Sequence, residues 1–558
     1  MKKVLYVIGV SAAALVLAAV VFVLTFDINS YRPRIEAAVS GATGLEVRIK
    51  GKMELSVFPF GVSAKNIYIT NKKVEIATLE SLKLAGELMP LLKKQLKITG
   101  CELVKPVVSI VKDAYGKYNF ESTEKISAEG QFGVVFSLYK LKMSKGTLLY
   151  LDEKTGEKTE FRDLDLAIKD IQAGNNAADF LKNASFTGDF SSSQVLQTNF
   201  RIENLKSSVR AVRGVYNFEP LAVSSFVYFD KKAGEKTELK NINMAVKDLV
   251  IGDSSGDIAK NISFTGNLTC KEVLNKELKI DNLSSLIKVE NGVTYLTSLN
   301  MDIFGGKAEG YLTADKSGTD AKYTVKFQIL ALDFSEFEKF FGAKKVIGGK
   351  GDLHAYITIE EKGARDMMSG MDGTFSLRGD NLVIYTMNLD KVLSSYEKSQ
   401  KFNLVDLGAF FIAGPIGTVA VMSTVALKGY RYGDLYLHAQ EGQGTITHFL
   451  SHWEVRGGVA DATDCALSTD HNRVALKGKL DLVRGRYDKV TVALLDDKGC
   501  AKFKQNISGP FGSPEIGKVN AVGSLAEPVF DLYRKAKRFV QGGRCDVFYN
   551  GAVQQPSE

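Results

Sequence analysis

The sequence has little of several features that mark particular classes of protein. Only 10 of its 558 residues are proline, so domains joined by proline-rich spacers are not expected. Lys and Arg outnumber Asp and Glu by only 72 to 64, with no dense basic block, so no nucleic-acid partner is expected. The five cysteines form no C-x-x-C pair, which argues against zinc ribbons and thioredoxin-like chemistry; they are Cys101, Cys270, Cys465, Cys500 and Cys545.

Motifs for catalysis are also missing from the sequence. His448 and His452 stand four residues apart, but the first is not followed by the Glu of a metalloprotease, and we interpret both as turn or surface histidines. The glycine-rich stretch 342–351 has the wrong spacing for a phosphate-binding loop, and no G-x-S-x-G elbow occurs. We therefore expect no enzyme activity, no catalytic residue, no metal site and no cofactor.

The sequence does contain one long hydrophobic run, at the N-terminus. The 23 residues from Val4 to Phe26 include no charge and follow Lys2 and Lys3. A helix of this length crosses a hydrocarbon core of about 30 Å. The alternative, a cleaved signal peptide, has a shorter apolar run and a small-residue cleavage site. We expect an uncleaved single-pass anchor with a cytoplasmic N-terminus and the bulk of the chain outside the membrane.

A short helix is expected directly after this run. Asn29 or Ser30 is suited to cap it, Pro33 suits its first turn, and Gly41 and Gly44 are placed to end it.

The pattern then changes to the alternation of β-strands. Apolar residues occupy every second position, separated by polar ones, and Gly, Asn and Asp mark turns between such segments. Three of the alternating residues are Leu45, Val47 and Ile49, and three more are Leu164, Leu166 and Ile168. Most of the chain is therefore predicted to be antiparallel β-structure.

Part of this β-structure is repeated. Residues 155–171 (TGEKTEFRDLDLAIKDI) reappear as residues 233–249 (AGEKTELKNINMAVKDL), an offset of 78 that continues without insertion. The second copy places Ile242, Met244 and Val246 where the first has Leu164, Leu166 and Ile168. Such a repeat is typical of a stacked array, whose units bury their apolar faces against one another. A duplication within an ordinary sandwich is the alternative.

The C-terminal region has three signals of its own. The apolar stretch 404–420 is broken by Gly and Pro and suggests a buried loop or a cap, with a membrane-interacting loop as the alternative. Cys500 and Cys545 are placed to form a disulfide that ties the end of the chain to the sheet. Near residues 525–540, apolar positions spaced by three and four alternate with Arg534, Lys535, Lys537 and Arg538. This basic amphipathic helix is suited to rest on an anionic membrane, to dock a partner, or to cover the sheet edge.

The region after the anchor resembles the opening of the AsmA family of Gram-negative envelope proteins. The resemblance is carried by Asp27 at the membrane exit, Pro33 in the helix, the Thr43-Gly44 turn, Gly51 and the Phe58-Pro59 step. It continues through residues 89–120, 304–315 and 346–393.

This resemblance implies a protein anchored in the inner membrane by residues 4–26, with its bulk in the periplasm. It also implies kinship with bridge-like lipid transporters, whose sheet curls into an elongated, taco-like groove that shelters phospholipid acyl chains for outer-membrane biogenesis. A half-apolar sheet with few helices must either close on itself or cover its apolar face with a ligand, which fits this picture. The predicted groove residues are Leu45, Val47, Ile49, Leu164, Leu166, Ile168, Ile242, Met244 and Val246. The alternative is a periplasmic scaffold or assembly factor that carries no lipid and serves outer-membrane proteins or lipopolysaccharide. The expected partners are phospholipid and an outer-membrane or envelope protein.

The expected organisation has five parts. They are the transmembrane anchor at 1–26, an AsmA-type region of one short helix and strands at 27–130, the β repeats at 131–300, a C-terminal β region at 301–520, and the basic amphipathic helix and tail at 521–558. The expected fold class is thus mostly β, with a transmembrane helix, a curled antiparallel sheet and a few short helices.

Overall fold

The structure is a computed structural model, and it describes most of the chain after residue 26. The described residues are 27–57, 60–86, 95–121, 133–172, 183–231, 234–252, 260–276, 278–340, 347–361, 367–385, 388–391, 393, 411, 442–511, 513–517, 520–521 and 545–556. The predicted anchor at 4–26 and the four basic residues Arg534, Lys535, Lys537 and Arg538 lie outside them.

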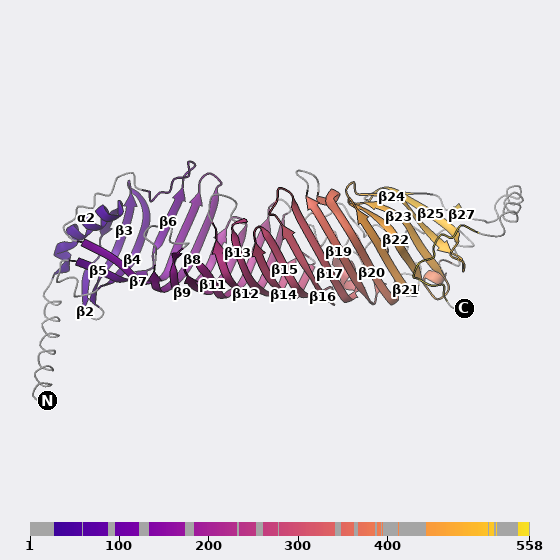
Figure 1. The fold of residues 1–558 in the computed structure, drawn as a ribbon, viewed down its shortest axis with the longest axis horizontal. Coiled ribbons are helices and arrows are strands. Elements are labelled where there is room, and N and C mark those ends of the chain that lie inside the picture. The colour runs from indigo at the N-terminus through magenta and orange to yellow at the C-terminus, as the bar shows by residue number, and fades with distance from the viewer. Residues whose placement is uncertain are drawn as a thin grey trace, which may run out of the picture. The chain divides into compact units, whose positions relative to one another are not determined.

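The chain divides into two compact units. Figure 1 shows their strands and helices as a ribbon coloured by residue number. The N-terminal unit comprises Met1–Asp253 and Ser263–Lys271, and the C-terminal unit comprises Ser254–Ile262 and Glu272–Glu558.

Strands dominate the described part of both units, as the sequence predicts. The first strands are β1 (Glu46–Ile49), β2 (Met53–Val57), β3 (Phe60–Asn71), β4 (Val74–Gly86), β5 (Gln95–Val104), β6 (Val107–Lys112), β7 (Gly133–Asp152), β8 (Glu157–Gln172), β9 (Ser185–Gln197), β10 (Phe200–Val212), β11 (Val215–Asp230), β12 (Glu235–Ile251) and β13 (Ile262–Asn275). They are followed by β14 (Leu278–Glu290), β15 (Val293–Ile303), β16 (Gly306–Asp315), β17 (Ala321–Asp333), β18 (Ile347–Gly348), β19 (Lys350–Glu361), β20 (Met371–Ile384), β21 (Gly444–Arg456), β22 (Val459–Ser468), β23 (Arg473–Asp481), β24 (Arg486–Leu495), β25 (Ala501–Pro510), β26 (Glu515–Ile516) and β27 (Asn520–Ala521). The helical elements given bounds are η1 (Ile28–Tyr31), α2 (Arg32–Thr43), α5 (Phe334–Phe340) and η3 (Met367–Gly370).

The strands pair with their sequence neighbours in most cases, and the pairs are antiparallel. For example, β7 pairs with β8, β8 with β9, β9 with β10, β10 with β11 and β11 with β12. The parallel pairs among the described residues are β5 with β7 and β6 with β7. The prediction of a mostly antiparallel β-fold with a few short helices is confirmed.

The short helix after the run lies where the sequence predicts it, but its ends differ. Asp27, rather than Asn29 or Ser30, supplies the first cap by accepting a hydrogen bond from the N–H of Asn29. The helix α2 continues through Gly41 and ends at Gly44, which has φ +70°. A glycine inside a helix costs only about 1 kcal/mol relative to alanine, so Gly41 does not stop it.

The helix α2 is fixed to the outer edge of the first strands by side-chain hydrogen bonds. Ser40 Oγ accepts the N–H of Val47 at 3.0 Å, and Glu36 Oε1 accepts the N–H of Ile49 at 2.6 Å. These side chains satisfy backbone groups that an unpaired strand edge would otherwise expose.

The internal repeat appears in the backbone as left-handed residues at the same spacing, some of which lie at β-bulges. Positive φ angles occur in pairs 78 residues apart, at Asp163 and Asn241, Asp170 and Asp248, and Asn204 and Asn282. Asp and Asn tolerate this left-handed conformation better than other non-glycine residues. At a β-bulge, the extra residue keeps apolar side chains on one face of the strand although their sequence spacing shifts from two to three.

Packing differs along the chain. In the C-terminal unit, β19 to β25 supply most of a large buried core, including Leu353, Ile357, Phe375, Leu377 and Trp453, each 0–2% exposed. In the N-terminal unit, a smaller core lies at β1 to β4, around Ile49, Met53 and Ile67.

Candidate functional site

Six predicted groove residues lie on one face of the sheet in the N-terminal unit. The register joins Leu166 of β8 to Met244 of β12 through one row of paired residues, which runs Leu166, Phe190, Ser207, Leu221 and Met244. A second row joins Ile168 to Val246 through Gly188, Val209 and Phe218. Leu164 and Ile242 lie two positions from Leu166 and Met244 on the same face, and Ile242 pairs with Val223. We call this surface the apolar face.

The opposite face of the same strands is polar. Its row between the two strands runs Asp165, Ser191, Lys206, Ala222 and Asn243. Ion pairs also lie on this face; Arg162 Nε donates to Glu160 Oε1 at 2.6 Å, and this hydrogen bond lowers the pKa of the Glu160 carboxyl. The sheet thus separates a charged, hydrated surface from an apolar one.

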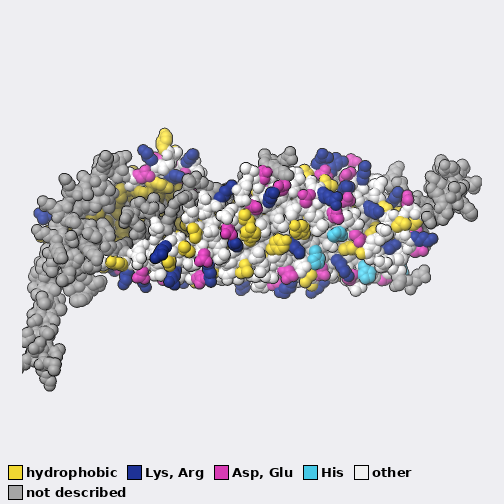
Figure 2. Space-filling view, viewed as in Figure 1, with side chains coloured by type: hydrophobic (Ala, Val, Ile, Leu, Met, Phe, Trp, Pro, Cys, Tyr) yellow, Lys and Arg dark blue, Asp and Glu magenta, His cyan; other side chains and the backbone are white. Residues whose placement is uncertain are grey.

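The apolar face is only partly covered. Leu164, Leu166, Ile168, Ile242 and Met244 are half-buried, although residues of this kind are usually buried in folded proteins. The principal contacts of the described helices are with β1, β2, β17, β18 and β19 rather than with β7 to β12. Figure 2 shows a band of hydrophobic side chains at the back of a hollow in the N-terminal unit.

A cavity of about 440 Å³ borders one of these rows. Its lining includes Met143, Leu166, Phe190 and Ser207, and also the charged residues Lys142, Asp165, Asp189 and Lys206. The serines of the face do not make it polar, because their hydroxyl groups donate to the backbone: Ser192 Oγ donates to the carbonyl of Arg162 at 2.8 Å, and Ser207 Oγ to that of Ser208 at 3.3 Å. A partly uncovered apolar surface of this kind suits a hydrocarbon ligand.

Several residues of the apolar face were not singled out from the sequence. They are Phe190, Val209, Phe218 and Leu221. The register shifts between Phe218 and Leu221, so strict alternation does not link them. A three-residue spacing between apolar residues around a bulge is the signal that reveals them.

The other three predicted groove residues lie in a different setting. Ile49 is 8% exposed and belongs to the small core at β1 to β4, against which Val47 packs. Leu45 directly precedes β1 and is half-buried. These residues hold the helix-bearing edge together, and we do not include them in the apolar face.

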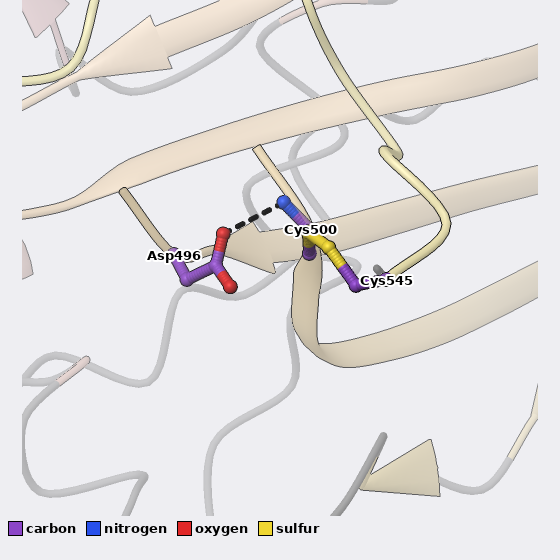
Figure 3. Close-up of side chains that lie close together, drawn as sticks. All are labelled: Asp496, Cys500 and Cys545. Carbon is purple, nitrogen blue, oxygen red and sulfur yellow. Dashed lines mark hydrogen bonds between the residues drawn. A yellow bond between two sulfur atoms is a disulfide. The ribbon is translucent and has the colours of Figure 1, made fainter. Parts of the chain in front are cut away.

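The two cysteines Cys500 and Cys545 are joined by a disulfide, with Cα atoms 6.2 Å apart (Figure 3). Asp496 lies beside them, and its Oδ1 accepts the N–H of Cys500 at 2.8 Å. Among the described residues, these three form the only set close enough to share a metal ion. The two sulfur atoms are bonded to each other, and the Asp496 carboxylate accepts the N–H of Cys500. This arrangement fits a structural disulfide that attaches the segment around Cys545 to the sheet.

The disulfide leads into a C-terminal segment that packs on the sheet. Tyr549 and Val553 are buried against Ala466, Ala475 and Ala493. The Tyr549 hydroxyl donates to Asp464 Oδ1 at 2.6 Å and accepts the N–H of Val553 at 3.0 Å. The chain end thus covers a second face of strands β22 to β24.

The two histidines four residues apart lie on β21, not on a helix. Four residues along a strand span about 13 Å, so His448 and His452 share a face without sharing a ligand. His448 is exposed, and its Nδ1 lies 2.7 Å from Asp380 Oδ1.

A search for membrane-crossing helices among the described residues finds none with sufficient length and apolarity. The run Val4–Phe26 lies outside that search, so the anchor stays a prediction.

A comparison with known protein families assigns the chain to a family. The model of the AsmA family matches residues 1–224 and 224–411. No protein in a search of curated proteins matches the chain. Because the matched segments cover well over half of its length, this chain belongs to the AsmA family.

Proposed function

We propose that this protein is anchored in the inner membrane by residues 4–26 and binds phospholipid acyl chains on the apolar face of its periplasmic sheet. It would thereby shelter or conduct lipid for outer-membrane biogenesis and lipid homeostasis. The observation that carries the proposal is the pair of rows from Leu166 to Met244 and from Ile168 to Val246, in which most of the apolar side chains are only half-buried, although Val246 is 6% exposed.

Hydrophobic burial supplies the binding energy for such a role. Each CH₂ group removed from water contributes about 0.8 kcal/mol, so a two-chain lipid is held by on the order of 25 kcal/mol when both chains are covered. Cross-strand rows of Leu, Ile, Val, Phe and Met offer many sites of similar chemistry. Such similarity favours movement of a chain along the face over trapping at one position.

The polar face has a complementary part in the proposal. Its ion pairs and exposed charges keep the other side of the strands in water, so that hydrocarbon is bound on one side only. Binding of this type requires no catalytic group.

Mass spectrometry of lipids that copurify with the full-length chain tests the proposal. We expect phospholipid to accompany the protein in stoichiometric amounts after detergent exchange. Protein that is folded but free of phospholipid would contradict acyl-chain binding and would favour the scaffold role.

A further inference from the structure

The C-terminal unit has a second surface of apolar residues. Along its cross-strand rows the side chains change from partly exposed (open) to buried (filled). One row of paired residues runs across β15, β16, β17, β19, β20 and β21; it is Leu299, Gly310, Phe327, Ala355, Phe375 and Trp453. Leu299 and Phe327 are half-buried, whereas Ala355, Phe375 and Trp453 are 4%, 1% and 0% exposed.

A neighbouring row shows the same transition at the same strands. It runs Ile287, Leu296, Leu312, Val325, Ile357, Gly373 and Val455. The first four residues are half-buried, and Ile357 and Val455 are each 1% exposed. In these two rows the step from open to filled therefore falls between β17 and β19. Toward one end of the strands the core already reaches β16 and β17, where Ala308 and Ile329 are 6% and 2% exposed.

Aromatic side chains from the chain itself occupy the filled part. Phe337 and Phe340 of α5 contact Phe304, with ring centroids 5.3 and 5.5 Å apart. Phe334, at the start of α5, meets Phe449 edge-on at 6.2 Å. Phe411 stacks on the same Phe449 ring at 5.6 Å and is completely buried.

Buried polar groups hold Phe411 in place. Its carbonyl oxygen accepts a hydrogen bond from Ser451 Oγ at 2.6 Å and another from Trp453 Nε1 at 3.2 Å. Both donors are buried, and a hydrocarbon chain cannot accept a hydrogen bond. A lipid that displaced Phe411 would remove this carbonyl from two donors in the core, so acyl chains compete poorly for this position.

We infer that the chain's own aromatic residues close these two rows at β19, so that acyl chains bind along the rows on β14 to β17 of this unit and do not enter the part formed by β19 to β25. This inference rests on the proposed function and specifies where, within the C-terminal unit, the lipid path ends. Strands β19 to β25 would then form a closed hydrophobic core and would not be part of the lipid path.

The single tryptophan of the chain makes the inference testable, because Trp453 reports on the filled part directly. Full-length protein is incubated with phosphatidylcholine carrying dibrominated acyl chains, whose bromine atoms quench tryptophan fluorescence on close approach. A second probe is Leu296→Trp in a Trp453→Phe background. Its matched control is Tyr295→Trp in the same background, because Tyr295 is the adjacent residue on the opposite, exposed face of β15.

We expect Leu296→Trp to lose most of its fluorescence to brominated lipid, while Trp453 in the natural sequence and Tyr295→Trp keep theirs. Quenching of Trp453 to the same extent as Leu296→Trp would overturn the inference and leave lipid binding intact. Absence of quenching at Leu296→Trp would also overturn the inference, because acyl chains would then not bind along β14 to β17. The proposed function is tested separately, by the phospholipid that copurifies with the same protein. Leu312→Trp, the next residue of the row, provides the same test if Leu296→Trp does not fold.

Discussion

The substitution Met244→Asp tests whether the apolar face of the N-terminal unit contacts lipid. Met244 is half-buried and ends the row that begins at Leu166. Its neighbour Asn243 lies on the polar face of the same strand, so Asn243→Asp adds the same charge on the other side. Both variants add one carboxylate, but to opposite faces, and Met244→Asp also removes an apolar side chain.

The magnitude follows from what a bound acyl chain would cover. Complete burial of a Met side chain contributes about 1.5–3 kcal/mol, and roughly half of this remains for the ligand to supply at a half-buried position. A carboxyl group buried without a partner costs about 1–3 kcal/mol even when it takes up a proton. The sum is about 2–4 kcal/mol, or a loss of roughly 30-fold to 1000-fold in lipid affinity at this position.

Binding of a fluorescent phospholipid to the purified full-length variants measures the effect, with circular dichroism to confirm folding. Met244→Asp should bind weakly, and Asn243→Asp should bind as the natural sequence does. If both variants bind lipid as strongly as the natural sequence does, the assignment of the apolar face is refuted. A matching loss in both would show that added charge, rather than its position on the sheet, is responsible.

Three further predictions concern the C-terminal unit. Cys545→Ser breaks the disulfide to Cys500 and should lower the free energy of unfolding by about 2–4 kcal/mol, as measured by denaturant titration; an unchanged midpoint would show that the fastening adds nothing. Tyr549→Phe removes the hydroxyl that bonds Asp464 and leaves a buried amide unpaired, so it should cost about 1–3 kcal/mol and speed hydrogen exchange in the terminal segment; unaltered exchange would contradict this. Burial raises the pKa of Tyr487 to about 12 from an unfolded value of 10.0. The contribution of this pKa shift to the free energy of unfolding is therefore complete below pH 10 and is lost as the pH rises toward 12. The loss should approach about 3 kcal/mol, and Tyr487→Phe should lack this part of the alkaline decline in unfolding free energy.

Much of the fold could be predicted from local pattern. Alternating apolar and polar residues predict strands because successive side chains point to opposite faces, and β8 and β12 lie where this pattern places them. The 78-residue offset predicts a structural repeat, and the positive φ angles at Asp163 and Asn241 recur at this spacing. The triplets at Leu164 and Ile242 therefore fall on a common face because equivalent sequences form equivalent strands.

Pattern alone did not distinguish an open apolar face from a filled one. Ile49, Leu166 and Ile357 all stand in alternating segments, yet Ile49 lies in a small core beside α2, Leu166 is half-buried, and Ile357 is enclosed. Burial depends on what packs against a face, and those residues come from elsewhere in the chain. Sequence periodicity does not contain that information.

The sequence by itself determined that this protein is built from alternating strands, repeats part of them at an interval of 78 residues and belongs among AsmA-like chains. Only the tertiary structure decided which apolar rows stay open and which are closed. The reason is that Phe411 and the aromatic residues of α5 reach the filled rows through long-range contacts, and hydrogen bonds from Ser451 and Trp453 hold the carbonyl of Phe411. Such contacts arise from the way distant segments meet, not from the order of residues within a strand.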